Sequence, residues 1–131
     1  MSIRQTLEIM FDAYGRGDLE TTYSYFDEGV VHKAYEDNKS LALGANLIGL
    51  EALRKRVDTI GGLIAFESYV PQVIITEGDR AAAIIKVSAV HHQTGQRFDT
   101  TISHFYVFKD GKVTELIEFF DSALVQVIVG A

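Results

Sequence analysis

Cysteine is absent from this sequence, and so is any long apolar run. Without cysteine the chain forms no disulfide, offers no thiol nucleophile and supplies no thiolate ligand for zinc. No apolar stretch approaches the roughly 20 residues that a membrane-spanning helix requires, and no secretory leader pattern opens the chain. We therefore expect a cytoplasmic protein that does not enter a membrane.

Positive charge is scarce as well. The chain has 12 Lys and Arg against 18 Asp and Glu, and the net charge of −6 opposes binding to a phosphate backbone. The short basic run Arg54-Lys55-Arg56 is predicted to be a solvated helix face, so we expect no nucleic-acid partner. A hydrophobic fraction of 47% with 23% charged residues indicates a folded core, and 131 residues are most simply one domain.

Three helices are predicted in the N-terminal half. Ser2 and Gln5 form a capping box at the start of the first helix. The apolar stripe of that helix consists of Ile3, Leu7, Met10, Phe11 and Tyr14. Asp18 is a suitable N-cap for a second helix. A third helix is predicted from Gly49 to Ile60, ending at Gly61-Gly62.

Strands dominate the second half of the chain. Before the third helix, Val30–Tyr35 is predicted as a short strand and residues 36–48 as a loop. After it, turn residues separate four predicted strands, which are Phe66–Thr76, Arg80–His92, Phe98–Phe108 and Lys112–Phe120. Helices followed by an antiparallel meander indicate an α+β fold in which the helices pack on one face of the sheet.

A strand register follows if the turns at Thr94-Gly95 and Asp110-Gly111 have two residues each and no bulge intervenes. Across the first turn, His91 is then opposite Phe98, and Ile85 is opposite His104. Across the second, Phe108 is opposite Val113, His104 is opposite Ile117, and Thr100 is opposite Asp121. Because side chains alternate between faces, one mostly apolar face is expected to look toward core and pocket; on the last two strands it carries Phe98, Thr100, Ile102, His104, Tyr106, Phe108, Val113, Glu115, Ile117, Phe119 and Asp121. The other face carries an apolar group large enough to predict a subunit contact, made of Phe105, Val107, Leu116 and Phe120. A slip of one residue would exchange the two faces.

Five short segments, spread over nearly the whole chain, occur in a characteristic order: Tyr14–Asp18, Tyr25–His32, Gly49–Arg54, Phe108–Val113 and Glu118–Asp121. In this order the sequence resembles the SnoaL-like, or polyketide cyclase-like, proteins of the nuclear-transport-factor-2-like superfamily, which also includes ketosteroid isomerase and limonene epoxide hydrolase. The resemblance implies a single domain over residues 1–131. It also implies a cone-shaped curved antiparallel sheet, covered on one face by three helices (a cystatin-like α+β roll), and commonly a homodimer formed through the outer sheet face.

The resemblance also implies a catalytic residue. In the cyclases an aspartate at the end of the last strand removes a proton next to a carbonyl, and Asp121 holds that position. An apolar pocket that raised the pKa of its carboxyl would suit this role. His104, in the middle of its strand on the inner face, would bind a ligand oxygen or shuttle a proton, but the ideal register places it about 13 Å from Asp121. Alternatively, Asp121 caps the following segment and His104 is a core histidine paired with Glu115 or Tyr106.

Further residues are expected to line a pocket for a small hydrophobic molecule: Tyr14, His32, Tyr35, Thr100, Tyr106 and Phe119. Tyr14, His32 and Tyr35 correspond to regions that line the cavity mouth in the superfamily, although each also has a simple packing role. No metal site is expected, because the adjacent His91-His92 pair would face opposite sides of a strand. No cofactor is expected either.

The predicted function is a cofactor-free cyclase or isomerase that transfers a proton on a hydrophobic carbonyl compound. The alternative is a non-catalytic domain that binds a ligand or dimerises. Ketosteroid isomerase activity is disfavoured, because strand one has His32-Lys33-Ala34-Tyr35 where that enzyme has an acidic base. A weaker alternative is a limonene-type epoxide hydrolase that uses Arg97, Asp99 and Asp121, but the predicted register places the two aspartates on opposite faces.

Overall fold

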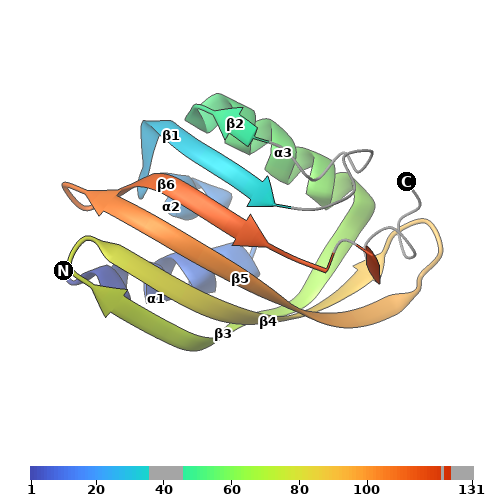
Figure 1. The fold of residues 1–131 in the computed structure, drawn as a ribbon. Helices are drawn as coiled ribbons and strands as arrows, with labels where there is room; N and C mark the ends of the chain where they lie inside the picture. The colour runs from blue at the N-terminus through green and yellow to red at the C-terminus, as the bar shows by residue number, and fades with distance from the viewer. Residues whose placement is uncertain (36–45, 122, 125–131) are drawn as a thin grey trace.

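The computed structural model describes residues 1–35, 46–121 and 123–124, with Tyr35 described by its backbone alone. Three helices and six strands follow one another along the chain (Figure 1): α1 (Ile3–Gly15), α2 (Leu19–Tyr23), β1 (Phe26–Tyr35), β2 (Asn46–Ile48), α3 (Leu50–Leu63), β3 (Ile64–Glu77), β4 (Arg80–His91), β5 (Arg97–Lys109) and β6 (Lys112–Phe119). The four strands predicted in the second half are confirmed to within two residues at each end. Among the described residues, no helix has the length and apolar character needed to cross a membrane.

The helix starts follow from local capping. The Ser2 hydroxyl accepts a hydrogen bond from the Gln5 amide at 3.1 Å, and the Ser2 amide donates to the Gln5 side chain at 2.8 Å, so the predicted capping box is confirmed. Asp18 caps α2 as predicted, through the amide of Thr21. The predicted end of the third helix is wrong, because Gly61 and Gly62 do not take a positive φ and α3 continues through them.

The strands form one sheet in the order β2-β1-β6-β5-β4-β3. The last four strands are antiparallel neighbours, as predicted, but β1 pairs with β6 in parallel, so the sheet is mixed. Asn46–Ile48 forms a strand on β1 where a loop was predicted. Residues 36–45 of that predicted loop lie outside the described residues. The α+β class is confirmed.

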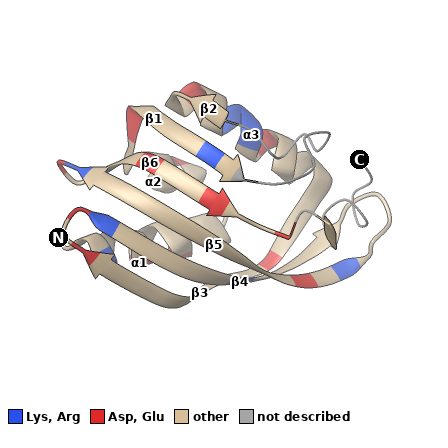
Figure 2. Ribbon diagram, in the orientation of Figure 1, with Lys and Arg blue, Asp and Glu red and all other residues tan. Residues whose placement is uncertain are grey.

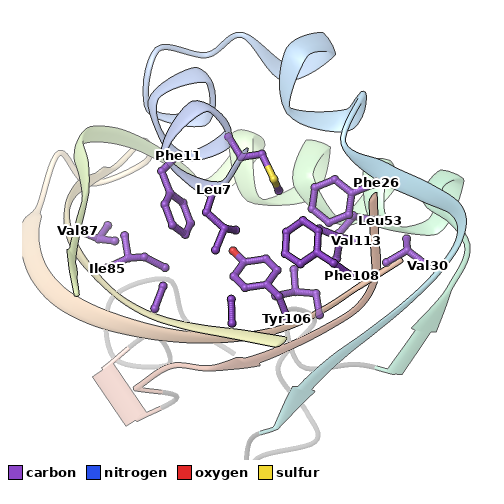
Figure 3. Packing of buried hydrophobic residues seen from close by; sticks show 14 of the residues in the cluster. Leu7, Phe11, Phe26, Val30, Leu53, Ile85, Val87, Tyr106, Phe108 and Val113 are labelled. Carbon is purple, nitrogen blue, oxygen red and sulfur yellow. The ribbon is translucent and has the colours of Figure 1, made fainter. Parts of the chain in front are cut away.

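The sheet curves, and the helices cover its concave side (Figure 3). Two register shifts between β3 and β4, at Phe66/Ser68 and Pro71/Val73, bend the edge strand. Pro71 is tolerated there because an edge strand can do without one backbone donor. The core between helices and sheet includes Leu7 and Phe11 of α1 and Tyr106 of β5, all at most 3% exposed.

The predicted pairing of β5 with β6 is wrong beyond its first residues. Phe108 pairs with Val113 as expected, but Val107 then pairs with Glu115, so Thr114 is the extra residue of a bulge. Past this bulge, each β6 side chain lies on the face opposite to the predicted one. Glu118 therefore faces inward beside His104.

The same bulge corrects two other positions. Phe119 was expected in the pocket, but its side chain lies on the outer face and is 49% exposed. Thr100 does not pair with Asp121, because Ser103 pairs with Phe119 and β6 ends there. Leu116, which was expected on the outer face, is buried.

The pairing of β4 with β5 differs from the prediction by two residues. Ala89 pairs with Phe98, and Ala83 pairs with His104. The turn is longer than two residues, because the His91 amide donates to the Gln96 carbonyl. A shift of two residues leaves every side chain on its own face, so the inner face predicted for β5, with His104 and Tyr106, is confirmed.

Candidate functional site

A cavity of about 130 Å³ lies between the helices and the concave face of the sheet. Its wall is mostly apolar and aromatic, and all three described helices and five of the described strands contribute to it. Four rings from α1 and β3 form one side: Tyr14 lies 4.8 Å from Tyr69 between ring centroids, Phe66 lies 5.3 Å from Tyr69, and Phe11 lies 6.3 Å from Tyr69. Burial raises the pKa of the Tyr14 and Tyr69 hydroxyls, so both remain protonated at neutral pH.

A chain of charged and polar side chains interrupts this apolar wall. From helix α3, Arg56 Nη2 lies 2.7 Å from Glu118 Oε1 on strand β6. The other oxygen, Glu118 Oε2, lies 2.8 Å from His104 Nε2 on β5. The opposite nitrogen of that ring, His104 Nδ1, lies 2.7 Å from the Tyr106 hydroxyl. Arg56, Glu118 and His104 are each nearly buried, with side chains 7–11% exposed.

The charge on Glu118 sets the hydrogen-bond directions in this chain. Burial by itself would raise the pKa of the Glu118 carboxyl, but the Arg56 charge and the hydrogen bond from His104 outweigh it and hold that pKa well below its usual range. An ionised carboxylate only accepts hydrogen bonds, so His104 Nε2 carries the proton that it donates to Glu118. In the neutral ring, Nδ1 then accepts from the Tyr106 O–H.

His32 on strand β1 lies in the same wall. Its side chain is only 1% exposed, and among the described residues neither ring nitrogen has a hydrogen-bond partner. Burial, followed by the positive charge of Arg56, lowers the pKa of His32 from 6.5 to about 4. The imidazole is therefore neutral at pH 7 and presents one donor and one acceptor.

The cavity brings together most of the residues that the sequence singled out. Those that line it are Tyr14, His32, Thr100, His104, Tyr106 and Asp121. Phe119 is on the outer face, as described above, and the side chain of Tyr35 lies outside the described residues. The roles assigned to these residues remain predictions.

Asp121 follows β6 at the border of the cavity, and its side chain is exposed. Its Oδ1 accepts a hydrogen bond from the Leu124 amide at 3.0 Å. This is the capping contact considered as an alternative from the sequence. His104 likewise has the Tyr106 partner of its alternative, but its second partner is Glu118 and not Glu115.

The arrangement expected of an epoxide hydrolase does not form around Asp121. Arg97 pairs with Glu67, and Asp99 accepts a hydrogen bond from Ser88. Both Arg97 and Asp99 are exposed, and neither lines the cavity. The described part of the chain also contains no group of three His, Asp or Glu side chains that could hold a metal ion.

Arg56 and Glu118 were missed by the sequence reasoning. The basic run on α3 is visible in Figure 2, with acidic positions on the same helix. It was predicted to be solvated, but Arg56 points inward. Its position next to Val57 and three residues after Leu53, on the apolar side of the helix, was a usable signal. Glu118 had no such signal, because the bulge at Thr114 decides its direction.

Comparison with known proteins places the chain among relatives of the same fold. The family model of the SnoaL-like domain matches residues 7–116. No curated protein matches the sequence. An NTF2-like protein of unknown function from Burkholderia pseudomallei has a TM-score of 0.90 at 20% identity, with 100% of both chains covered.

Two other solved structures carry functional descriptions. A proposed isomerase from Bacillus subtilis has a TM-score of 0.83 at 15% identity, covering 96% of this chain and 91% of its own. A proposed SnoaL-like polyketide cyclase from Mesorhizobium loti has a TM-score of 0.72 at 19% identity, covering 90% of this chain and 98% of its own. At these identities the similarity shows a shared fold, which by itself does not determine an activity.

Proposed function

The chain belongs to the SnoaL-like family, and on that premise we propose that its cavity binds a small, largely hydrophobic carbonyl compound and transfers a proton on it by acid–base catalysis without a cofactor. The observation that supports this function is the imidazole of His104, held between Glu118 and Tyr106 in the wall of an apolar cavity. An imidazole oriented by a buried carboxylate is well suited to accept and return a proton.

Glu118 determines which nitrogen of His104 is basic. Because the carboxylate accepts the Nε2 proton, the lone pair of the neutral ring lies on Nδ1, where the Tyr106 hydroxyl donates. In the proposed step, the Tyr106 oxygen takes a proton from the carbon next to the substrate carbonyl while its own proton passes to Nδ1. The substrate becomes an enolate, and Glu118 stabilises the imidazolium. Returning the proton to another carbon isomerises the substrate; attack of the enolate on a second carbonyl closes a ring.

Asp121 is the other candidate base. In the cyclases that the sequence resembles, the base is an aspartate at the end of the last strand, and Asp121 borders the cavity from that position. Its side chain is exposed and caps the segment that follows. A base at this site would receive the proton directly from the substrate, without the histidine relay.

Hydrogen exchange on a model ketone tests the proposed step, which cyclisation and isomerisation share. A cavity of 150 Å³ is known to hold benzene, so a one-ring ketone suits the 130 Å³ cavity. We expect the protein to speed deuterium incorporation beside the carbonyl of cyclohexanone in D₂O, followed by NMR. Glu118→Gln should slow this exchange by roughly tenfold or more. Glu115→Gln is the matched control, because Glu115 lies on the outer face of the same strand and pairs with Lys33.

The results distinguish Asp121 from the His104–Tyr106 pair as the base, and they distinguish catalysis from ligand binding alone. Loss of exchange in Asp121→Asn, with Glu118→Gln unaffected, would assign the base to Asp121. Binding of cyclohexanone without any exchange above the buffer rate would contradict catalysis. It would favour the second candidate, a non-catalytic ligand-binding domain. That candidate is supported by the fact that both oxygens of Glu118 and both nitrogens of His104 already have protein partners.

We also propose that the protein forms a homodimer through the outer face of the sheet. Exposed apolar side chains gather there on β4, β5 and β6: Ile84 is 38% exposed, Phe105 38% and Phe119 49%. Ile84 pairs with Ser103, which pairs in turn with Phe119, and Phe105 lies on the same face two residues further along β5. A second copy of the chain would cover these apolar side chains and remove them from water.

A further inference from the structure

His32 stands out among the buried polar groups of the cavity wall. Among the described residues, buried side-chain nitrogen or oxygen atoms without a hydrogen-bond partner occur at His32 and at the Tyr23 hydroxyl. Neither nitrogen of His32 has a hydrogen-bond partner in the described part of the chain, although the residue is only 1% exposed. Buried polar groups are almost always hydrogen-bonded, and leaving them unpaired costs free energy. A group that enters the cavity and bonds to His32 would remove that cost.

The surroundings of His32 determine what kind of group this is. On the sheet, His32 of β1 pairs with Leu116 of β6. Glu118 follows two residues after Leu116 on β6. The charges of Arg56 and Glu118 both act on the His32 imidazole. Arg56 and Glu118 neutralise each other at 2.7 Å, and the second Glu118 oxygen is held by His104. The pocket around His32 therefore has no net charge to offer a ligand.

We propose that His32 recognises an uncharged hydroxyl group, so that the cavity selects hydroxylated ring compounds, such as phenols and enols, over both hydrocarbons and carboxylates. A hydroxyl donates to the bare nitrogen of the neutral imidazole or accepts from the protonated one. A hydrocarbon leaves His32 unpaired. A carboxylate brings an unpaired charge into an apolar cavity beside Glu118, which is unfavourable. The inference rests on the proposed function only in requiring that the cavity admit a ring-sized molecule.

Three one-ring probes test this selection at pH 7: phenol, toluene and benzoate. Their dissociation constants are measured from backbone amide chemical shifts in wild type and in His32→Phe, which keeps the ring but removes both nitrogens. We expect the ratio of the toluene constant to the phenol constant to fall about tenfold in His32→Phe. We also expect wild type to bind benzoate more weakly than phenol. Tyr23→Phe is the matched control, because it removes the Tyr23 hydroxyl, which also lacks a partner among the described residues, and should leave the ratio unchanged.

The possible results distinguish this inference from the function on which it rests. If no probe binds wild type, the ring-sized cavity and the selection by His32 both fail. If toluene and phenol bind but the ratio is the same in His32→Phe, only the inference fails. It also fails if Tyr23→Phe abolishes the preference, or if benzoate binds more tightly than phenol.

A measurement on wild type covers the case in which His32→Phe does not fold. Phenol should shift the side-chain ¹⁵N resonances of His32, because one ring nitrogen gains a hydrogen bond. Toluene should leave those resonances nearly unchanged, since it forms none. Phenol that binds in the cavity without moving the His32 nitrogen resonances would overturn the proposal.

Discussion

His32 and Glu118 are buried side by side in one wall, and each has a lowered pKa for a different reason. His32 resists protonation because burial disfavours its charged form and Arg56 repels it. Glu118 resists protonation although burial opposes its charge, because Arg56 and His104 stabilise the carboxylate. In both cases the side chain binds a proton less tightly in the folded protein than in the unfolded chain. Lowering the pH therefore destabilises the fold.

His32 and Glu118 lower the stability of the fold over different pH ranges. Between pH 6.5 and about pH 4 the unfolded chain protonates His32 while the folded protein does not, so stability falls as the pH falls. Glu118 adds its loss only near and below its ordinary pKa of 4.5. We expect His32 to account for about 1.5 kcal/mol of the loss between pH 6.5 and pH 5. Urea unfolding at a series of pH values should show this loss in wild type and in Tyr23→Phe but not in His32→Phe. An unchanged pH dependence in His32→Phe would contradict the lowered pKa.

At the scale of single elements, strand β6 shows where prediction from sequence stops. The Asp110-Gly111 turn is as expected, with φ values of 52° and 78°. Both faces of the strand carry apolar residues, however, since Leu116 and Phe120 alternate with Ile117 and Phe119. A strand that is apolar on both sides does not specify its register through the hydrophobic pattern. The bulge at Thr114 could therefore not be predicted from the sequence, and neither could the inward direction of Glu118.

Strand β5 was predictable for the opposite reason. Its inner positions hold His104, Tyr106 and Phe108, and these are buried as expected. The register error on the β4 side was an even number of residues, which cannot exchange the faces. The residues of the cavity wall on β5 could thus be named from sequence, but their partners on β6 could not.

Deleting Thr114 tests whether the bulge itself is needed to hold Glu118. The deletion removes the extra residue, so Glu115 follows Val113 directly and still pairs with Val107, and Glu118 stays opposite His104. We therefore expect the deletion to keep the buried contacts of Glu118. Its cost in urea unfolding, followed by circular dichroism, should be well below the roughly 3–5 kcal/mol typical of removing one partner from a buried pair. Glu118→Ala is the comparison, because it removes the partner of Arg56 and His104 and should show a loss of that larger size. A loss in the Thr114 deletion as large as that in Glu118→Ala would show that the bulge itself holds Glu118 in place.

For the whole molecule, the fold could be predicted because many weak signals agree in order and spacing. The helix caps, the turn residues and the segments shared with SnoaL-like proteins all indicate the same α+β architecture, and the family model covers residues 7–116. The polar network in the cavity was not foreseen, because it joins Arg56 of α3, Glu118 of β6 and His104 of β5 across long stretches of sequence. A contact of this kind depends on the exact register of the sheet.

The exposed apolar side chains on the outer face of the sheet lead us to predict that the chain forms a dimer. We expect wild type to elute as a dimer, with a mass near twice the 14.5 kDa of one chain, in size-exclusion chromatography with light scattering. Replacing both rings, as Phe105→Ser with Phe119→Ser, should shift the protein toward a monomer at the same concentration. Ile75→Ser is the control, because Ile75 is 62% exposed on the edge strand β3. A monomeric wild type, or a monomer produced by Ile75→Ser alone, would contradict the proposed interface.

The parallel pairing of β1 with β6 also bears on how the chain is made. Among the described strands, β6 comes last in sequence but lies in the interior of the sheet, between β1 and β5. On the ribosome, β1 emerges early and has to wait for β6 before it can join the remaining strands, since His32 pairs with Leu116. A nascent chain that ends at Lys109 would hold two separate pieces of sheet, β2-β1 and β5-β4-β3, without the strand that pairs with both. Folding of the cavity wall therefore has to wait until β6 has been synthesised, and long-range pairing of this kind is slow to form.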